Sequence, residues 1–419
     1  MNADKIKINN LFNSNRFDLS AKYLYAKFRQ KDIKSNFGLD VYREHLKVWN
    51  GFIEYNNPNK NTFESFKNEF DHILDSIKEN GFDNNISKII VDEDLCLLNG
   101  AHRTTSCIIN NSEATFQIGG SGQKLCDYNM FRGLGLQEPY MDAMAYELAK
   151  FNKNMFIVSL FPSAIGCDDE VDKILSDNGR VGYKKLIKLN STGAFNLMRQ
   201  MYYGEEWAGG WYNNFGGFRD KANLCFTNLN PIRVYLVEFD SLDVAKKVKS
   251  KIRDIYKISN HSVHINDTHE QTIRLARVLF NNNSIHFMNN SKLVNYVKFE
   301  EQLSFYKKWI VENDLDIEDY CVTASSILSM YGLREGNDLD YLHKSKEIVG
   351  HNMVHSHNEY GENRYHTHVD DIIYNPINHF YYNDIKFSSL NVVKKLKEKR
   401  GEPKDYIDLE LIGPKMGEI

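Results

Sequence analysis

Two aspartates near the C-terminal end of the chain have the spacing of a site for a divalent cation. Asp338 and Asp340 stand at the start of an apolar segment, and residues two apart in a strand point to the same side of a sheet. Their carboxylates could therefore hold one Mg²⁺ ion, which in phosphoryl or nucleotidyl transfer is shared between carboxylates and nucleotide phosphates. The preceding strand ends in small residues, so the backbone at Ser325 and Ser326 could approach a triphosphate closely. We predict that Asp338 and Asp340 are metal ligands and catalytic residues, and that Ser325 and Ser326 bind nucleotide.

Alternating helices and strands must position these residues. From about residue 300 the pattern predicts a helix over FEEQLSFYKKWIVEN, a strand over DYCVT, a further helix, and a strand over NDLDYL. A small pair, a gap of roughly ten residues and then Asp-x-Asp resembles the nucleotidyltransferase superfamily, with two serines where Gly-Ser is usual. Residues 372–412 resemble the tail of sugar-modifying nucleotidyltransferase-like proteins from surface-polysaccharide gene clusters.

The resemblance covers about residues 300–419 and implies a transferase domain that uses Mg²⁺ and a nucleoside triphosphate, with ATP as the expected donor. Two other interpretations stay open. The missing glycine is compatible with a degenerate domain that binds nucleotide without catalysis, and an isolated Asp-x-Asp can also be a pair of solvated turn carboxylates.

A second candidate site follows a pair of short predicted strands near the front of the chain. The segment NGAHRTT places Gly100 at the start of a helix, where free backbone amides form an anion pocket. His102 and Arg103 would add charged donors, and arginine suits bidentate phosphate recognition. We predict nucleotide binding by Gly100, His102, Arg103 and Thr104; the alternative is that His102 and Arg103 brace the helix.

This segment resembles the nucleotide-binding core shared by ParB partition proteins, sulfiredoxins and free-serine kinases, over about residues 70–110. A sulfiredoxin would carry its reactive cysteine where Ala101 stands. A partition protein would need a helix-turn-helix and a basic face, and neither is found. The resemblance therefore implies a kinase-like or plain nucleotide-binding module.

Two weaker candidates contain histidine. In NHSVHINDTHEQ, Asp267 could act as a general base on a sugar hydroxyl with His264 nearby, although Asp267 or Thr268 could equally cap the helix that follows. Closer to the C-terminus, two His-x-His pairs flank a turn and could bind zinc, although exposed loop histidines are common. These are His355, His357, His366 and His368.

Composition favours a soluble, cytoplasmic protein. The net charge is −4 and there is no long basic run, which argues against nucleic acid as the main partner. The N-terminus lacks the apolar segment of a signal peptide, and no apolar stretch is long enough to span a membrane. The six cysteines form no C-x-x-C pair, as expected for reduced thiols.

A chain of 419 residues exceeds one comfortable core, so we predict a multidomain α/β (α+β) fold. Local patterns predict helices over 17–30 and 63–80, strands in MFIVSLF and RVYLVEF, and a charged helix in SLDVAKKVKSKIRDIYKI. The predicted domains are 1–120, a helical lead-in with the front nucleotide-binding module; 121–295, a middle region that completes this module or binds the acceptor; and 296–419, the nucleotidyltransferase-like domain.

Together these patterns predict Mg-dependent phosphoryl transfer from a nucleoside triphosphate to a sugar or sugar-containing acceptor in surface-polysaccharide biosynthesis. A nucleotidyltransferase acting on a sugar phosphate and a non-catalytic nucleotide-binding regulator are the alternatives. The expected partners are therefore a nucleotide and a glycan acceptor, and the sequence leaves the oligomeric state open.

Overall fold

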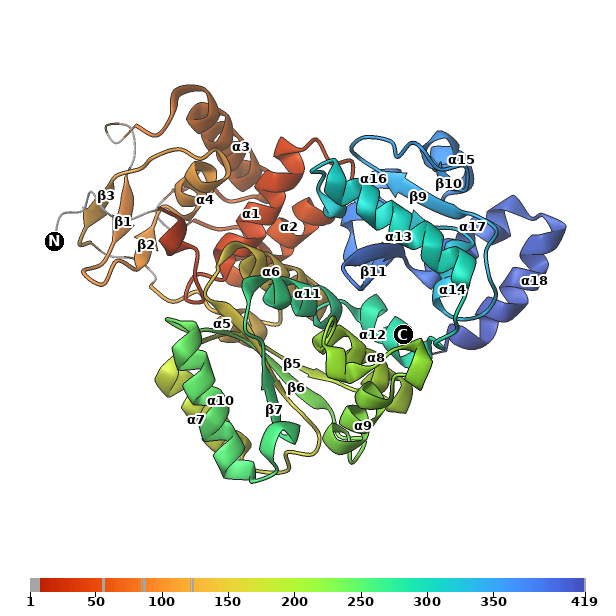
Figure 1. Ribbon diagram of the computed structural model, residues 1–419. Coiled ribbons are helices and arrows are strands. Elements are labelled where there is room, and N and C mark those ends of the chain that lie inside the picture. Colours follow the sequence, from red (N-terminus) through yellow and green to blue (C-terminus); the bar gives the residue numbers. More distant parts are fainter. Residues whose placement is uncertain are drawn as a thin grey trace.

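Three separate β-sheets follow one another along the chain, with helices packed around and between them (Figure 1). The computed structural model describes residues 8–54, 57–83, 85, 88–120, 122 and 124–417. We call the described residues before 121 the front unit, those of 122–295 the middle unit, and those after 295 the C-terminal unit. The α/β (α+β) class expected from the sequence is confirmed.

The front unit combines four helices with a small mixed sheet. Its strand order is β2-β1-β3, with β1 antiparallel to β2 and parallel to β3. The elements are α1 (Asp18–Gln30), α2 (Phe37–Asn50), α3 (Phe63–Asn80), β1 (Ile89–Val91), β2 (Leu97–Asn99), α4 (Ala101–Ile109) and β3 (Phe116–Ile118).

Local chemistry explains where α3 begins and ends. The hydroxyl of Thr62 accepts a hydrogen bond from the backbone N–H of Ser65, and the Ser65 hydroxyl accepts one from the N–H of Thr62. Gly81 follows the last turn with a φ of +75°, a conformation that favours glycine. Apolar residues at three- and four-residue spacing form the buried face: Phe63, Phe66, Phe70, Leu74 and Ile77.

The middle unit is a four-stranded antiparallel sheet between two layers of helices. Its order is β5-β6-β4-β7, so β7 is an edge strand. The elements are α5 (Tyr128–Gly133), α6 (Glu138–Phe151), β4 (Met155–Leu160), α7 (Asp168–Asn178), β5 (Arg180–Ile187), α8 (Ser191–Met201), α9 (Gly216–Cys225), β6 (Ile232–Glu238), α10 (Leu242–Tyr256), β7 (Val263–Ile265), α11 (His269–Leu279) and α12 (Asn282–Asn290).

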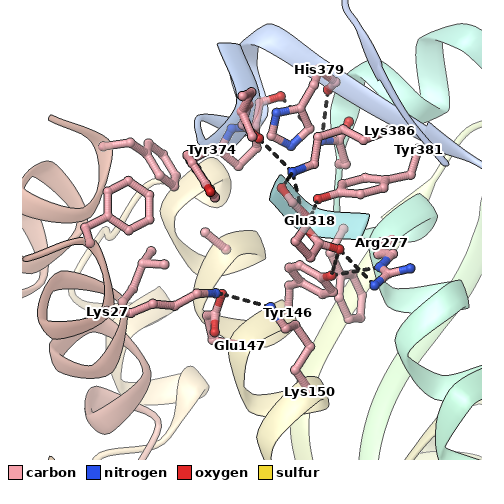
Figure 2. A pocket seen from close by; sticks show the side chains of 18 of the residues that line it. Lys27, Tyr146, Glu147, Lys150, Arg277, Glu318, Tyr374, His379, Tyr381 and Lys386 are labelled. Atoms are coloured by element: carbon pink, nitrogen blue, oxygen red, sulfur yellow. Dashed lines mark hydrogen bonds and ion pairs between the residues drawn. The ribbon is translucent and has the colours of Figure 1, made fainter. Parts of the chain in front are cut away.

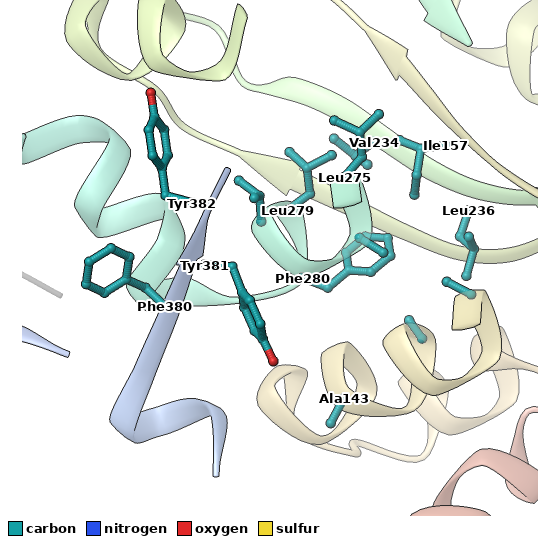
Figure 3. Packing of buried hydrophobic residues seen from close by; sticks show 14 of the residues in the cluster. Ala143, Ile157, Val234, Leu236, Leu275, Leu279, Phe280, Phe380, Tyr381 and Tyr382 are labelled. Carbon is teal, nitrogen blue, oxygen red and sulfur yellow. The ribbon is translucent and has the colours of Figure 1, made fainter. Parts of the chain in front are cut away.

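Both faces of the central strand β4 are covered, which is why its sequence is an almost continuous apolar run. Val158 and Leu160 pack against α7 and α10. On the other face, Ile157 and Leu236 lie toward α6 and α11, where Figure 3 shows Leu275 from α11. The sheet therefore separates two hydrophobic cores, one on each of its faces.

The C-terminal unit has a five-stranded mixed sheet in the order β10-β9-β8-β12-β11. Strand β8 is antiparallel to β9 and parallel to β12, while β9 is parallel to β10 and β11 is antiparallel to β12. The elements are α13 (Val297–Glu312), β8 (Tyr320–Thr323), α14 (Ser326–Met330), β9 (Leu339–His343), β10 (Val354–Ser356), α15 (Gly361–Arg364), α16 (Val369–Tyr374), β11 (His379–Tyr382), β12 (Ile385–Ser388), α17 (Leu390–Arg400) and α18 (Pro403–Ile412).

One hydrophobic core runs through all three units. It extends from Leu11 in the front unit to Ile412 at the end of α18. Figure 3 shows part of its continuity, where Phe380 and Tyr382 of β11 lie beside α11 and α12. The units are thus packed together rather than tethered.

A largely buried carboxylate joins the middle and C-terminal units (Figure 2). Glu318 lies in the short 3-10 helix η6 (Ile317–Asp319) just before β8. Its Oε1 accepts hydrogen bonds from the Tyr146 hydroxyl at 3.0 Å and pairs with Arg277 at 2.8 Å. Its Oε2 accepts one from Tyr381 at 2.7 Å and pairs with Lys386 at 3.3 Å. Although burial opposes ionisation, Lys386 and Arg277 hold the pKa of Glu318 well below its usual value.

Among the described residues, none of the helices combines the length and the apolar character needed to cross a membrane.

We expect Glu318→Gln to destabilise the protein by about 3 kcal/mol, because it leaves the buried Lys386 without its paired carboxylate and leaves Arg277 with the longer pair to Asp384 at 3.6 Å. The measurement is the urea denaturation midpoint at neutral pH. The matched control is Glu312→Gln on α13, an exposed residue that pairs with Lys308 at 3.6 Å, and it should shift stability by less than about 0.5 kcal/mol. Equal midpoints for the two variants would contradict the proposed role of Glu318.

Candidate functional site

The turn between β8 and α14 has an unusual backbone. Ala324 adopts a left-handed conformation, with a φ of +54°, in a position that is 4% exposed. Residues with a Cβ rarely adopt this region, whereas glycine enters it freely. Ala324 therefore holds a conformation that glycine would adopt with less strain. It directly precedes Ser325 and Ser326, which the sequence predicts to bind nucleotide.

The hydroxyl of Ser326 connects the start of α14 to both aspartates. It donates to the carbonyl of Asp338 at 3.4 Å and accepts from the backbone N–H of Asp340 at 3.3 Å. Antiparallel pairing of β8 and β9 also places Thr323 opposite Asp340. The structure therefore brings Ser326 next to the backbone of Asp338 and Asp340, although Asp338 lies in the bend just before β9 and not in the strand that the sequence predicted.

Asp340 belongs to a chain of buried polar side chains. Its Oδ1 lies 3.1 Å from Nε2 of His357, whose Nδ1 is 3.1 Å from the hydroxyl of Tyr365. That hydroxyl donates to Thr323 Oγ1 at 3.3 Å, and Thr323 Oγ1 is 3.0 Å from Ser388 Oγ. These contacts fix the orientation of the Asp340 carboxylate at the junction of three strands.

A cation that sequence reasoning missed lies beside the same turn. Nη2 of Arg334 is 3.3 Å from the hydroxyl of Ser325, and its guanidinium makes a two-pronged pair with Asp408 at 2.5 and 2.7 Å. Arg334 is the sole basic residue between Ser325 and Asp338 in the sequence, which is the signal that could have identified it. A guanidinium here suits recognition of a phosphate.

Asp408 holds Arg334 through an ionic cluster between α17 and α18. Lys397 pairs with Asp408 at 2.5 Å and with Asp405 at 3.5 Å, and Arg400 pairs with Asp405 at 2.6 Å. Burial raises the pKa of Asp405, but hydrogen bonding from Arg400 outweighs it and lowers that pKa to about 2. The end of the chain thus positions the cation next to Ser325.

The two aspartates fit the oxygen-donor chemistry of Mg²⁺. Asp338 is half-buried, and neither its carboxylate nor Oδ2 of Asp340 accepts a hydrogen bond from the described part of the protein. In the described ranges no three His, Cys, Asp or Glu side chains gather in a group that could hold a metal. The protein would therefore supply two carboxylates, with phosphates and water as the other ligands.

The histidine pairs considered for zinc do not converge. His355 and His366 are exposed, His357 faces Asp340, and His368 accepts the backbone N–H of Asp370 as the N-cap of α16. Each side chain therefore has a different environment, and the geometry gives no support to a shared zinc site.

The front candidate lies on the opposite side of the molecule (Figure 1). Gly100 is the N-cap of α4 with a φ of +98°, and among the described residues no side chain caps the first amides of this helix. Arg103 is half-buried and donates to the carbonyl of Lys88. Thr104 is fully buried, and its hydroxyl has no hydrogen-bond partner among the described residues.

His102 differs from the charged donor that the sequence suggested. Its Nε2 lies 2.9 Å from the hydroxyl of Tyr42, and its ring is 4.5 Å from that of Phe70. Burial, reinforced by the positive charge of Lys22, lowers the pKa of His102 well below its usual value. The imidazole is therefore neutral at physiological pH and braces α3 and α4 against α2.

The middle candidates lie at β7 and at the start of α11, next to a different sheet from either of the other two candidate sites. Asp267 is exposed, and its backbone N–H donates to the side chain of Gln271, as part of the cap of α11 by Thr268. His264 is buried in β7, and burial together with Lys249 lowers its pKa to about 3. A group with so low a pKa is a poor proton acceptor at neutral pH, so the geometry argues against His264 as a general base.

A cavity of about 250 Å³ lies at the other end of α14, between the middle and C-terminal units. Ser329 and Met330 of α14 line it, as do Trp211, Arg199 and Glu300. The guanidinium of Arg199 stacks over Phe215 at 5.1 Å and Tyr382 at 5.3 Å, and it forms no ion pair with any described carboxylate. Although Glu300 is exposed, desolvation beside the cavity raises its pKa against the opposing effect of Arg199.

The acid stability of the C-terminal unit should depend on Asp405. Its lowered pKa gives stabilisation that is complete at neutral pH and is lost as pH falls from about 4 to about 2. We expect Asp405→Asn to cost about 2 kcal/mol at pH 7 and to flatten the pH dependence in that window. Urea titrations at pH 7, 4 and 3 measure both effects. Glu410→Gln, an exposed change on the same helix, should reproduce the wild-type profile.

The conformation of Gly100 gives a separate test of the front module. A Cβ at this position would lie 3.3 Å from both the Cα of Ile89 and the carbonyl oxygen of Lys88, so Gly100→Ala should destabilise the protein by about 1–3 kcal/mol. Gly133→Ala is the control, because Gly133 ends α5 with open space around it. Thermal denaturation compares the two, and an unchanged melting temperature in Gly100→Ala would show that the turn is not required.

Comparison with known proteins identifies no relative: no family model, no curated protein and no solved structure matches the chain. The inferences about function therefore depend on the geometry of the sites.

Proposed function

We propose that the C-terminal unit is a nucleotidyltransferase-like domain that transfers a phosphoryl group from a nucleoside triphosphate to a hydroxyl of a sugar or sugar-containing acceptor. The observation that carries this proposal is the position of α14. Its first residue, Ser326, connects to Asp338 and Asp340, and its last residues line a cavity. A helix of five residues is roughly 7 Å long, which is a gap that a bound nucleoside triphosphate and a bound sugar could span between them.

The donor end offers groups suited to a triphosphate. Asp338 and Asp340 would hold Mg²⁺, which supplies charge neutralisation to the phosphates when bound. Arg334 lies beside Ser325 and adds a positive charge that Asp408 holds in place. His357 keeps one oxygen of Asp340 engaged, which leaves the other oxygen for a ligand.

The acceptor end offers groups suited to a sugar. Trp211 is 43% exposed and presents an aromatic face on which a sugar ring can stack. Glu300 lies in the same cavity, and its raised pKa suits a carboxyl that takes the proton from the attacking hydroxyl. In the proposed reaction the acceptor oxygen bonds to the terminal phosphorus while the bond from that phosphorus to the bridging oxygen of the leaving diphosphate breaks.

The front unit would provide a second nucleotide-binding element of the ParB and sulfiredoxin-like kind, through the free amides after Gly100 and through Arg103. Transfer of a nucleotidyl group to a sugar phosphate would use the same C-terminal groups and differs in which phosphorus is attacked. Either reaction would serve surface-polysaccharide assembly, and this context follows from the family resemblance alone.

A second candidate function is nucleotide binding without catalysis. Two observations favour it: Ala324 occupies the left-handed position where a glycine would be free of strain, and Oδ1 of Asp340 is already engaged by His357 at 3.1 Å. This candidate predicts nucleotide binding that no acceptor converts into turnover.

Nucleotide consumption with a panel of sugars, with and without Mg²⁺, tests the proposal. We expect Asp340→Asn to lower kcat/KM about a hundredfold and Glu300→Gln to lower kcat at unchanged nucleotide affinity. Glu301→Gln, an exposed neighbour on α13, should leave both constants unchanged. Binding that is retained without turnover by any acceptor would favour the non-catalytic function, and Mg-dependent turnover that survives in Asp340→Asn would contradict the assignment.

A further inference from the structure

Four basic side chains act electrostatically on the imidazole of His264 at the edge of the middle sheet. Lys249 and Arg253 come from one face of α10, Arg274 comes from α11, and Lys221 comes from α9. All four oppose protonation of His264, in addition to its burial. Helices α9, α10 and α11, whose basic residues span more than 50 residues of sequence, therefore contribute positive charge to the surroundings of His264.

No carboxylate neutralises these charges directly. Among the described residues, none of the four cations forms an ion pair within 4.0 Å. Lys221 donates to the carbonyl of Asn260 and Lys249 to that of Ile265, both at 2.7 Å, so these contacts satisfy donors without supplying negative charge. The charge of Asp267 acts on one member of the cluster, Lys249. Like charges held together in this way repel one another.

Several polar atoms of these residues lack hydrogen-bond partners in the part of the chain that the structure describes. They are Nε2 of His264, Nε of Arg253 and Nε of Arg274, all buried. Ser159 lies directly opposite His264 across the β4–β7 pair, and its buried hydroxyl also has no partner in the described structure. A buried donor without an acceptor costs about 1–3 kcal/mol, so this concentration calls for a ligand that supplies acceptor oxygens.

Aromatic rings adjoin the cluster. The ring of Tyr202 meets that of His264 edge-on at a centroid distance of 5.1 Å, and Trp207 packs against Tyr202 at 5.1 Å. Trp207 is 48% exposed, so part of its face is open to a ligand. The cations and the rings together can recognise an anionic group that is attached to a ring.

We propose that the face formed by Lys221, Lys249, Arg253, Arg274 and His264 binds the phosphate monoester of a small ring-containing metabolite, such as a sugar phosphate or a mononucleotide. A phosphate monoester carries between one and two negative charges and three acceptor oxygens at neutral pH, which matches both the unpaired charge and the free donors. This site lies in the middle unit and does not depend on the proposed function of the C-terminal unit.

Thermal stability and calorimetry with inorganic phosphate as the first probe test the proposal. We expect phosphate to raise the melting temperature of the wild type, since a ligand that binds only the folded state stabilises it. The double variant R253Q/R274Q should bind phosphate at least tenfold more weakly. Without phosphate its melting temperature should equal or exceed that of the wild type, because the repulsion is relieved. This second readout separates lost binding from a failure to fold.

The control is Arg219→Gln on α9, a cation that donates to Asn214 and is not part of the cluster. It should keep the wild-type response. Glucose 6-phosphate and AMP as further probes, followed by the fluorescence of Trp207, distinguish a sugar phosphate from a nucleotide. The proposal is overturned if phosphate leaves the wild type unchanged, if R253Q/R274Q responds as Arg219→Gln does, or if a single-stranded oligonucleotide binds more tightly than every monoester.

Discussion

The carboxylate of Glu318 is the contact on which the arrangement of the units depends. It collects hydrogen bonds and ion pairs from α6 and α11 of the middle unit and from β11 and β12 of the C-terminal unit (Figure 2). A charge buried at this depth is tolerated only while its partners surround it, so the two units are fixed in one relative position. Lys27 of α1 extends the same network through Glu147 of α6, at 2.9 Å. The cavity at the end of α14 exists because these units meet in this way.

Much of the local structure follows from local chemistry. The apolar spacing of α3 and the glycine after it predict both the helix and its end, and the apolar runs of β4 and β6 predict strands. Other elements could not be predicted well from their local sequence patterns. Helix α6 mixes polar and apolar residues around most of its surface because it packs against α1, α11 and β4 at once. The sequence therefore indicates the helix-and-strand class, while the packing of the units depends on contacts between distant residues.

The candidate site divides in the same way. The proximity of Ser326 to Asp338 and Asp340 follows from a strand, a short helix and an adjacent strand, which a sequence pattern can reveal. The roles of His357 and Arg334 could not be predicted from such a pattern. His357 reaches Asp340 only because β9 pairs with β10, and Arg334 is held by Asp408, some seventy residues later in the sequence. The neutral state of His102 was equally hidden, since it results from the rings of Tyr42 and Phe70 closing over the imidazole.

The short length of α14 has a consequence for the energetics of any ligand pair. Ser326 at its start and Ser329 near its end are within one turn of each other, and the hydroxyl of Ser329 accepts a hydrogen bond from Gly336 in the loop that leads to Asp338. A helix this short has little room to bend between its ends, so a ligand that displaced Ser329 in the cavity would also shift the loop that leads to Asp338. By thermodynamic reciprocity, if one ligand changes the binding affinity of the second by some factor, the second changes the binding affinity of the first by the same factor. The binding of the donor and the binding of the acceptor would then be coupled before any bond is made.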